Sequence, residues 1–373
     1  MATRGRLVKA LLASTDDGQA RGPDERSPVT TATTPTPSIP FHARGALSQA
    51  VLERLTGRSA APLGELSGAA AHESTDPLRD DDLQLSLWML YASAYGSVDG
   101  IDPAQEWDPE LVETRLRLEQ IFEAAVRTAV PVPTLPPATQ DAVARALFTL
   151  VDEDDGPSLS RFLARKATAE QAREFLIQRS IYTRREADPH SWAIPRLSGR
   201  AKAALVEIQA DEYGGGRPER VHAEIFAKTL CGVGLDDAYA AYVEHVPAIT
   251  LASHNLMSLF GLNRRLIGAI VGHLAAFEMT SSIPNRLYGD GFRRLGFSDD
   301  VTDYFDEHVE ADAVHEQIAA RDLAGALAED RPDLLPDIMF GAAACLTIDG
   351  LVGAELLEKW ERGESSLRKA VPA

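Results

Sequence analysis

The stretch His308–Gln317 reads HVEADAVHEQ. If it forms a helix, some of its acids and imidazoles lie on the face that packs against the protein core. A helix turns about 100° per residue, so His308, Asp312 and His315 fall within about 60° of one another. Phe305 extends the same stripe upstream. Burying three such groups without partners would cost several kcal/mol, and a divalent metal ion would remove that cost. A hydrogen-bonded polar patch on the helix surface is the ordinary alternative for this stretch taken alone.

Two further predicted helices each carry an acid near their end. The stretch Gly268–Thr280 (GAIVGHLAAFEMT) is nearly all apolar but includes Glu278. A capping box predicts that another helix starts at Thr168, and this helix places Glu186 on its apolar stripe. We expect Pro189 to stop that helix. Pairing with nearby arginines is the simpler explanation of either acid alone.

A glycine run separates the last two candidates, Glu212 and His222. Glu212 shares a helix face with apolar residues, and we expect a new helix, with Pro218 in its first turn, to carry His222. An unbroken helix would hold the two side chains about 15 Å apart along its axis. The glycines at 214–216 allow the chain to fold back, which makes a shared site feasible. A surface acid and a core histidine are the ordinary alternative.

Together these stripes supply four carboxylates and three imidazoles, enough for two metal ions with bridging carboxylates. Mixed histidine and carboxylate ligands suit iron or manganese that binds oxygen. The lack of cysteine ligands argues against structural zinc. The predicted ligands are Glu186, Glu212, His222, Glu278, His308, Asp312 and His315.

Two helical metal folds fit this pattern. The ferritin-like pattern would use Glu219 with His222 and Asp312 with His315, each pair three residues apart, together with Glu186 and Glu278. That interpretation leaves Glu212 and His308 unused.

The alternative is a resemblance that extends over roughly residues 83–360. Residues 185–230 (READPHSWAIPRLSGRAKAALVEIQADEYGGGRPERVHAEIFAKTL), residues 274–297 (LAAFEMTSSIPNRLYGDGFRRLGF) and the HVEADAVHEQ stretch resemble the haem-oxygenase-like diiron oxidase/oxygenase (iron-containing redox enzyme) superfamily. The resemblance implies an all-α haem-oxygenase-like bundle in which all seven predicted ligands hold iron. Glu212 matches the extra carboxylate of the N-oxygenating members, and we prefer this family to the ferritin-like one. Some of those members carry a C-terminal cupin domain, which we do not expect here.

The resemblance also implies a function. We expect an O2-dependent diiron N-oxygenase that acts on a small amine, guanidine or aminoazole of a natural-product pathway, with Glu212 as a catalytic carboxylate. The electrons would come from an external reductase, because the sequence shows no flavin or nicotinamide fingerprint. Diiron C–H abstraction, with desaturation or C–C cleavage of an amino or fatty acid, is the first alternative. A metal-free helical interaction protein is the second alternative. A haem site is less compatible with so many acidic and histidine side chains in one place.

The composition disfavours several classes of binding partner and of cellular location. The chain has 37 Lys and Arg against 56 Asp and Glu, a formal net charge of −19, which disfavours nucleic acids and anionic membranes as partners. Cys231 and Cys345 are too few for a disulfide scaffold. No apolar run reaches the roughly 18 residues of a membrane span, and we find no signal peptide. We therefore expect a cytoplasmic protein.

The domain plan follows from composition and periodicity. Residues 1–45 are rich in Thr, Pro and Ser and predict a disordered arm. Residues 46–137 predict an N-terminal helical domain for homodimerisation, a role that the resemblance implies. It ends in the linker VPVPTLPP, and residues 138–373 predict the diiron domain.

We do not expect His190 and Asp211, which lie near predicted ligands in the sequence, to bind metal themselves. His190 follows Glu186 by four residues, and we expect a capping or ligand-supporting role for it. Asp211 lies on the outer helix face, where we expect it to be solvated.

Overall fold

The computed structural model describes residues 39–153, 156 and 158–371, although the side chains of residues 71–73, 310, 312 and 313 are outside the description. All regular elements in these ranges are helices, with no strand among them, so the all-α prediction is confirmed. Most of the predicted disordered arm lies outside the described residues. Its last few residues are described, and Phe41 is buried edge-on against Trp88.

Sixteen α-helices and one π-helix make up the regular structure of these ranges. They are α1 (Ala46–Leu55), α2 (Gly64–Glu73), α3 (Asp81–Tyr95), α4 (Pro109–Ala129), α5 (Gln140–Asp152), α6 (Leu159–Arg165), α7 (Ala169–Thr183), α8 (Ala187–Ser191), α9 (Gly199–Glu212), α10 (His222–Gly232), α11 (Ala248–Leu262), α12 (Ile267–Met279), α13 (Ser282–Arg294), α14 (Asp299–Gln317), the π-helix η7 (Ile318–Gly325), α15 (Ala326–Asp330) and α16 (Leu335–Glu361). Short 3₁₀ turns join several of them.

Local sequence signals explain where several helices begin. The Asp108 carboxylate accepts hydrogen bonds from the backbone of Glu110 and Leu111 at the start of α4, and Pro109 occupies the first turn. Thr168 and Gln171 form the predicted capping box of α7. Between α4 and α5 the proline-rich stretch contains no helix, as predicted.

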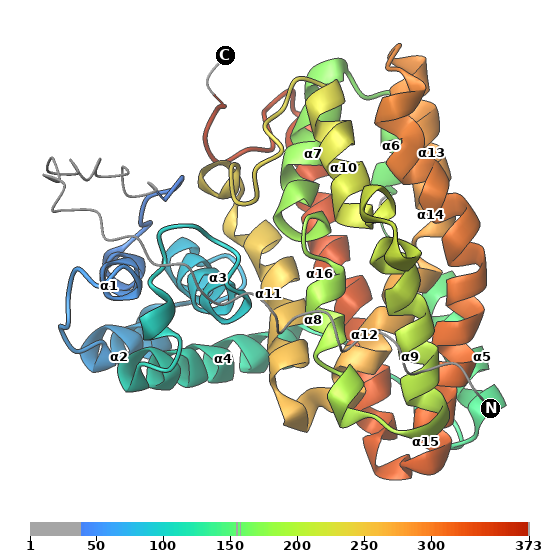
Figure 1. Ribbon diagram of the computed structural model, residues 1–373, viewed down its shortest axis with the longest axis horizontal. Helices are drawn as coiled ribbons and strands as arrows, with labels where there is room; N and C mark the ends of the chain where they lie inside the picture. Colours follow the sequence, from blue (N-terminus) through green and yellow to red (C-terminus); the bar gives the residue numbers. More distant parts are fainter. Residues whose placement is uncertain (1–38, 154–155, 157, 372–373) are drawn as a thin grey trace, which may run out of the picture. The chain divides into compact units, whose positions relative to one another are not determined.

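Helices α1–α4 lie on one side of α11, and the helices of the predicted metal domain lie on its other side (Figure 1). Helix α11 is almost fully buried because it packs against α3 on one face and against α8 and α16 on the other. The chain from Pro37 to Ala373 forms one compact unit. A domain boundary near residue 137 therefore remains a proposal.

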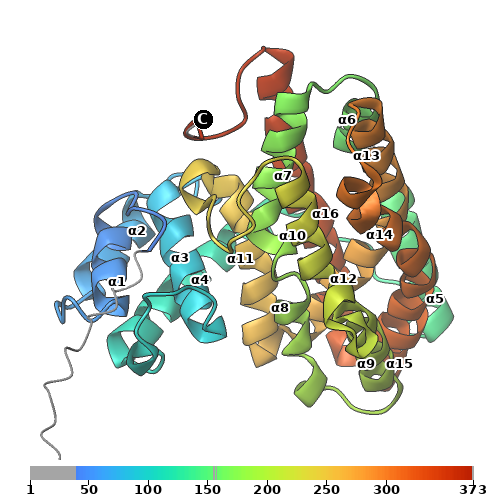
Figure 2. The ribbon, with the colours of Figure 1, turned by 45° about the horizontal axis from the view of Figure 1, so that its top comes forward.

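Helices α12 and α16 pack against each other through a very close backbone contact (Figure 2). A Cβ atom added at Gly272 of α12 would lie 1.8 Å from the carbonyl oxygen of Ile338 on α16. The glycine therefore allows the two backbones to touch. This contact sets the depth of α12, and with it the position of Glu278 near the end of that helix.

One described helical stretch, Pro332–Glu361, is long and apolar enough to cross a membrane by length and composition, with a mean hydropathy of 1.5. The bent pair Arg264–Met279 and Ser282–Arg294 would be a second candidate if both helices formed one span. The sequence expectation of no such run is corrected to this extent. Half of the first stretch is buried inside the protein, and core helices of globular proteins pass the same test.

Candidate metal centre

Glu186 lies in a break between two helices rather than at the end of one. Helix α7 ends at Thr183, and Glu186 immediately precedes the short helix α8. The prediction that Pro189 stops the helix is wrong, because Pro189 is the third residue of α8. A proline is tolerated there since the N–H groups of the first turn have no helical acceptor. The break turns the Glu186 side chain into the interior, where it is 5% exposed.

The glycine run brings Glu212 and His222 together, as the sequence suggested. Glu212 is the last residue of α9, and residues Gly214 to Gly216 all have positive φ angles, between 58° and 82°. His222 is the first residue of α10, and its Nδ1 lies 3.0 Å from Glu212 Oε2. The predicted helix start near Pro218 is wrong: residues Pro218–Arg220 form a 3₁₀ turn, and the α-helix begins only at His222.

Helices α12 and α14 contribute the remaining described candidates. Glu278, His308 and His315 are all buried. The inward stripe expected around them on α14 is confirmed, because Phe305 is fully buried. The side chain of Asp312, which was predicted as a ligand on the same stripe, lies outside the described residues.

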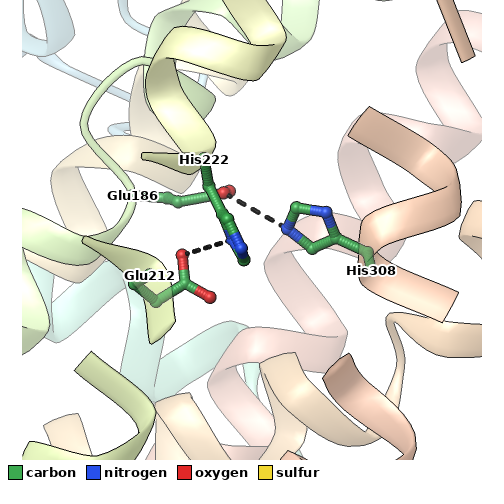
Figure 3. Close-up of side chains that lie close together, drawn as sticks. All are labelled: Glu186, Glu212, His222 and His308. Atoms are coloured by element: carbon green, nitrogen blue, oxygen red, sulfur yellow. Dashed lines mark ion pairs between the residues drawn. The ribbon is translucent and has the colours of Figure 1, made fainter. Parts of the chain in front are cut away.

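The six described candidates fall into two groups that share one residue. Glu186, Glu212, His222 and His308 form the first group, and each offers a ligand atom within 4.8 Å of the others (Figure 3). Glu212, Glu278 and His315 form the second group by the same measure. Glu212 therefore lies where one carboxylate could contact two adjacent cations.

Within each group an imidazole lies close to a carboxylate. His308 Nε2 lies 3.7 Å from Glu186 Oε1, and His315 Nδ1 lies 3.5 Å from Glu278 Oε2. Burial acts to raise the pKa of Glu212, but the neighbouring imidazoles, above all His222, outweigh it and lower the pKa to about 2. Glu212 is therefore a carboxylate anion at neutral pH, the form that binds metal.

These residues fit a metal ion by their chemistry and by their unsatisfied atoms. Glu212 Oε2 and His222 Nδ1 are buried and, despite their separation of 3.0 Å, neither atom has a hydrogen bond of acceptable geometry. Two buried polar atoms without hydrogen bonds are costly. A cation bound between them would satisfy both. A mixed set of carboxylates and imidazoles is what iron or manganese accepts.

Tyr304 supports two of the candidates, and sequence reasoning missed it. Its hydroxyl donates to the Glu186 carboxylate, at 3.1 Å from Oε1, and its carbonyl accepts from His308 Nδ1 at 2.7 Å. The second contact orients the His308 ring so that Nε2 faces Glu186. The spacing of four residues between Tyr304 and His308 on one inward stripe is the signal that could have identified it.

Asp211 is exposed, as expected, but it also contacts a predicted ligand. Its carboxylate is largely exposed, yet Oδ2 accepts a hydrogen bond from His315 Nε2 at 3.0 Å. His315 thereby presents Nδ1 toward Glu278. This contact between an exposed acid and a buried histidine orients the ring in the manner of ligand-supporting carboxylates elsewhere.

His190 supports Glu186 through the backbone, in line with its expected role. His190 Nδ1 lies 3.1 Å from the Glu186 carbonyl oxygen, so Nδ1 must donate. His190 Nε2 then accepts from His273 Nδ1 at 3.3 Å. Burial lowers the pKa of His190 to about 4, so the ring is neutral at physiological pH.

The contacts disfavour both an arginine partner for Glu186 and the ferritin-like ligand Glu219. Arg184 pairs with Glu224 and Arg185 pairs with Asp188, so the arginines next to Glu186 have other partners. Glu219, the ligand required by a ferritin-like pattern, is exposed and belongs to neither group. The geometry therefore favours Glu212 over Glu219 as the fourth carboxylate.

Comparison with known proteins agrees with this geometry. Residues 173–350, which include all six described candidates, match the family model of iron-containing redox enzymes. The match covers slightly less than half of the chain. It agrees with the resemblance noted in the sequence and supports a haem-oxygenase-like oxidoreductase domain.

Two individual proteins are similar to the chain. Nitrosourea synthase from Streptomyces achromogenes subsp. streptozoticus is 28% identical over 203 residues, which cover 54% of this chain and 43% of the relative. The chain therefore spans less than half of that protein. A CADD-like protein of unknown function from Nostoc punctiforme superposes with a TM-score of 0.48 and 15% identity, covering 63% of this chain and 99% of that chain.

Proposed function

We propose that this protein is an iron-dependent N-oxygenase that uses O2 to oxidise the nitrogen of a small nitrogen-containing metabolite. The observation that carries the proposal is the position of Glu212, which belongs to both ligand groups. A shared carboxylate supports a pair of iron ions rather than one. The similarity to nitrosourea synthase, whose name describes a nitrogen-oxidised product, supports nitrogen as the site of oxidation.

Glu186, Glu212, His222 and His308 would hold one iron ion, and Glu212, Glu278 and His315 would hold the other, with Asp312 as a further proposed ligand. Bound iron would supply the capacity to bind O2 and transfer electrons to it. The protein holds the imidazoles in fixed orientations through the Tyr304 carbonyl and Asp211. The Tyr304 hydroxyl also holds Glu186 in place by donating a hydrogen bond to its carboxylate.

Several parts of the proposal concern partners. The substrate would be an amine, guanidine or aminoazole, and an external reductase would deliver the electrons. We also propose that helices α1–α4 serve homodimerisation.

C–H oxidation remains the alternative reaction of the same centre, and the mass of the product separates the two reactions. Oxygenation at nitrogen adds about 16 mass units, whereas desaturation removes about two.

Iron content separates the proposed centre from a ferritin-like one. Glu212→Ala should lower the iron bound per chain from about two ions to one or fewer, because both groups lose a ligand. Glu219→Ala should leave the iron content unchanged, and it is the matched control. Iron analysis of purified, Fe(II)-reconstituted protein measures both. Loss of iron in Glu219→Ala with retention in Glu212→Ala would refute the proposed ligand set.

The reaction itself is tested with Fe(II)-reconstituted protein, a chemical reductant, O2 and candidate amines and guanidines. We expect O2 consumption coupled to the appearance of an N-oxygenated product by mass spectrometry. Iron-loaded protein that consumes no O2 with any nitrogenous compound, or a product that has lost hydrogen or carbon instead, would contradict N-oxygenation.

A further inference from the structure

Arg179 on α7 is a cation that has no carboxylate partner in the described part of the chain. Its guanidinium carbon lies 5.0–5.7 Å from the ring centres of three aromatic side chains, Phe175, Tyr182 and Tyr288. Its Nε is buried without a hydrogen bond, and no ion pair of the described residues includes it. Aromatic rings attract a cation by their faces, but they do not neutralise it. A guanidinium enclosed in this way is costly unless an anion binds to it.

Asp349 on α16 is open to solvent although it lies on the inward face of its helix. Helical periodicity places it on one stripe with Cys345, four residues earlier, and Leu356, seven residues later. Those two side chains are only 2% and 1% exposed, whereas Asp349 is exposed. The surrounding protein nevertheless raises the pKa of Asp349 above its ordinary value through burial. The carboxylate therefore lies in a recess of the structure and not on its outer surface.

Arg179 and Asp349 lie close enough to act on each other but do not form an ion pair. Burial raises the pKa of Tyr182, Arg179 opposes this effect and Asp349 adds to it, so both charges are near the same tyrosine. The described partners of Asp349 are uncharged: the Ser253 hydroxyl donates to Oδ1 at 2.6 Å, and the Cys345 thiol lies 3.9 Å from Oδ2. A positive and a negative group therefore face one space without neutralising each other by contact.

We infer that this recess binds a small zwitterion, with the carboxylate of the ligand on Arg179 and its ammonium group on Asp349. A guanidinium presents a fork of N–H donors that matches a carboxylate, and an aspartate accepts from an ammonium group. Asp349 would repel a simple anion and Arg179 would repel a simple cation, so a ligand that carries both charges is favoured. None of these residues belongs to the two groups of candidate metal ligands. The inference therefore does not rest on the proposed function.

The binding test uses three probes of similar size and different charge. L-norvaline carries both charged groups, pentanoate lacks the ammonium group, and butylamine lacks the carboxylate. The whole chain, purified and without added metal, is titrated with each probe by isothermal calorimetry at neutral pH. We expect L-norvaline to bind at least about tenfold more tightly than either other probe, because each of them loses one charged hydrogen-bonded contact. Equal affinities for all three probes, or no binding of L-norvaline, would overturn the inference.

Two variants should change the preference in opposite directions. Arg179→Met removes the positive charge, so it should weaken L-norvaline binding at least about tenfold and strengthen butylamine binding. Asp349→Asn removes the negative charge, so it should weaken L-norvaline binding by a similar factor and strengthen pentanoate binding. A misfolded variant would bind no probe more tightly than the wild type does. The two expected gains therefore separate the loss of a charge from a loss of structure.

Arg173→Met is the matched control, because Arg173 lies on the same helix but is exposed and donates to the Val233 carbonyl. It should leave all three affinities unchanged. The inference is overturned if Arg179→Met weakens L-norvaline and butylamine equally, or if Asp349→Asn leaves L-norvaline binding unchanged. If Arg179→Met does not fold, the wild-type preference and Asp349→Asn still decide the result. Because no iron or O2 takes part, either result leaves the N-oxygenase proposal to its own test.

Discussion

Tyr304 supports two candidate ligands that lie far apart in the sequence. Its hydroxyl holds Glu186, which precedes α8, and its carbonyl holds His308 on its own helix. The side chain is fully buried, and burial raises the pKa of Tyr304 well above its ordinary value. The hydroxyl therefore keeps its proton at neutral pH and acts as a donor to Glu186.

We predict that Tyr304→Phe lowers the affinity for Fe(II) by about 10- to 100-fold, the usual cost of losing a group that orients a metal ligand. Competition with a colorimetric chelator measures the affinity. Tyr288→Phe is the control, because Tyr288 belongs to the same aromatic cluster, in contact with Phe305, but has no contact with Glu186 among those described. Equal affinities in Tyr304→Phe and wild type would show that the hydrogen bond does not position Glu186.

At the scale of elements, the turn between α9 and α10 decides whether Glu212 and His222 meet. Gly214 has a φ of 75°, and a Cβ atom there would lie 2.7 Å from the backbone nitrogen of Val221. Both the backbone conformation and the lack of space require glycine. The neighbouring Gly215 has a φ of 58° but open space around it.

Gly214→Ala should therefore destabilise the fold by about 2–4 kcal/mol and reduce the iron bound, since it combines an unfavourable φ with a steric clash. Gly215→Ala should cost only about 1 kcal/mol, the price of the left-handed backbone alone, and should bind iron normally. Urea unfolding and iron analysis measure the two effects. Similar behaviour of both variants would mean that the close contact with Val221 is unimportant.

The crossing of α12 and α16 is the second element on which the centre depends. Gly272→Ala should destabilise the protein by about 3 kcal/mol or more, because its Cβ atom would overlap the Ile338 carbonyl and force the helices apart. Gly350→Ala on α16 is the matched control, since nothing lies within 4 Å of its added Cβ, and it should stabilise the protein by up to about 1 kcal/mol. Chemical denaturation of both variants tests this contrast. A Gly272→Ala variant as stable as the wild type would refute it.

For the whole molecule, the buried acids and imidazoles link iron binding to stability. Without a cation, Glu212 and His222 keep buried atoms that lack hydrogen bonds, whereas bound iron would satisfy them. Fe(II) at about 100 times its Kd should stabilise the folded protein by about 2.7 kcal/mol, and a chelator should reverse this. Thermal unfolding followed by circular dichroism measures the change under anaerobic conditions. Glu212→Ala should lose most of the stabilisation, and an identical melting temperature with and without iron would contradict a site in the core.

Most of the helical framework and the ligand candidates could be predicted from the sequence. The capping groups at Asp108 and Thr168 are local, since they involve residues within three positions of each other. Periodicity shows which face of one helix is inward, so the stripe of His308 and His315 could be identified without coordinates. The glycine run before His222 likewise indicated that the chain must turn. Each of these signals depends only on residues that are neighbours in the chain.

Only the tertiary structure could show which inward faces meet. The Tyr304–Glu186 hydrogen bond joins residues 118 positions apart, and the Asp211–His315 contact joins residues 104 positions apart. The periodicity of α9 placed Asp211 correctly on the outer face, but it could not show that His315 of α14 approaches that edge of the helix. The sequence also could not show that the buried side-chain oxygen of Gln209 lacks a hydrogen bond, because the groups around it come from distant segments. Helix periodicity sets the direction of a side chain, but packing between distant segments decides what that side chain contacts.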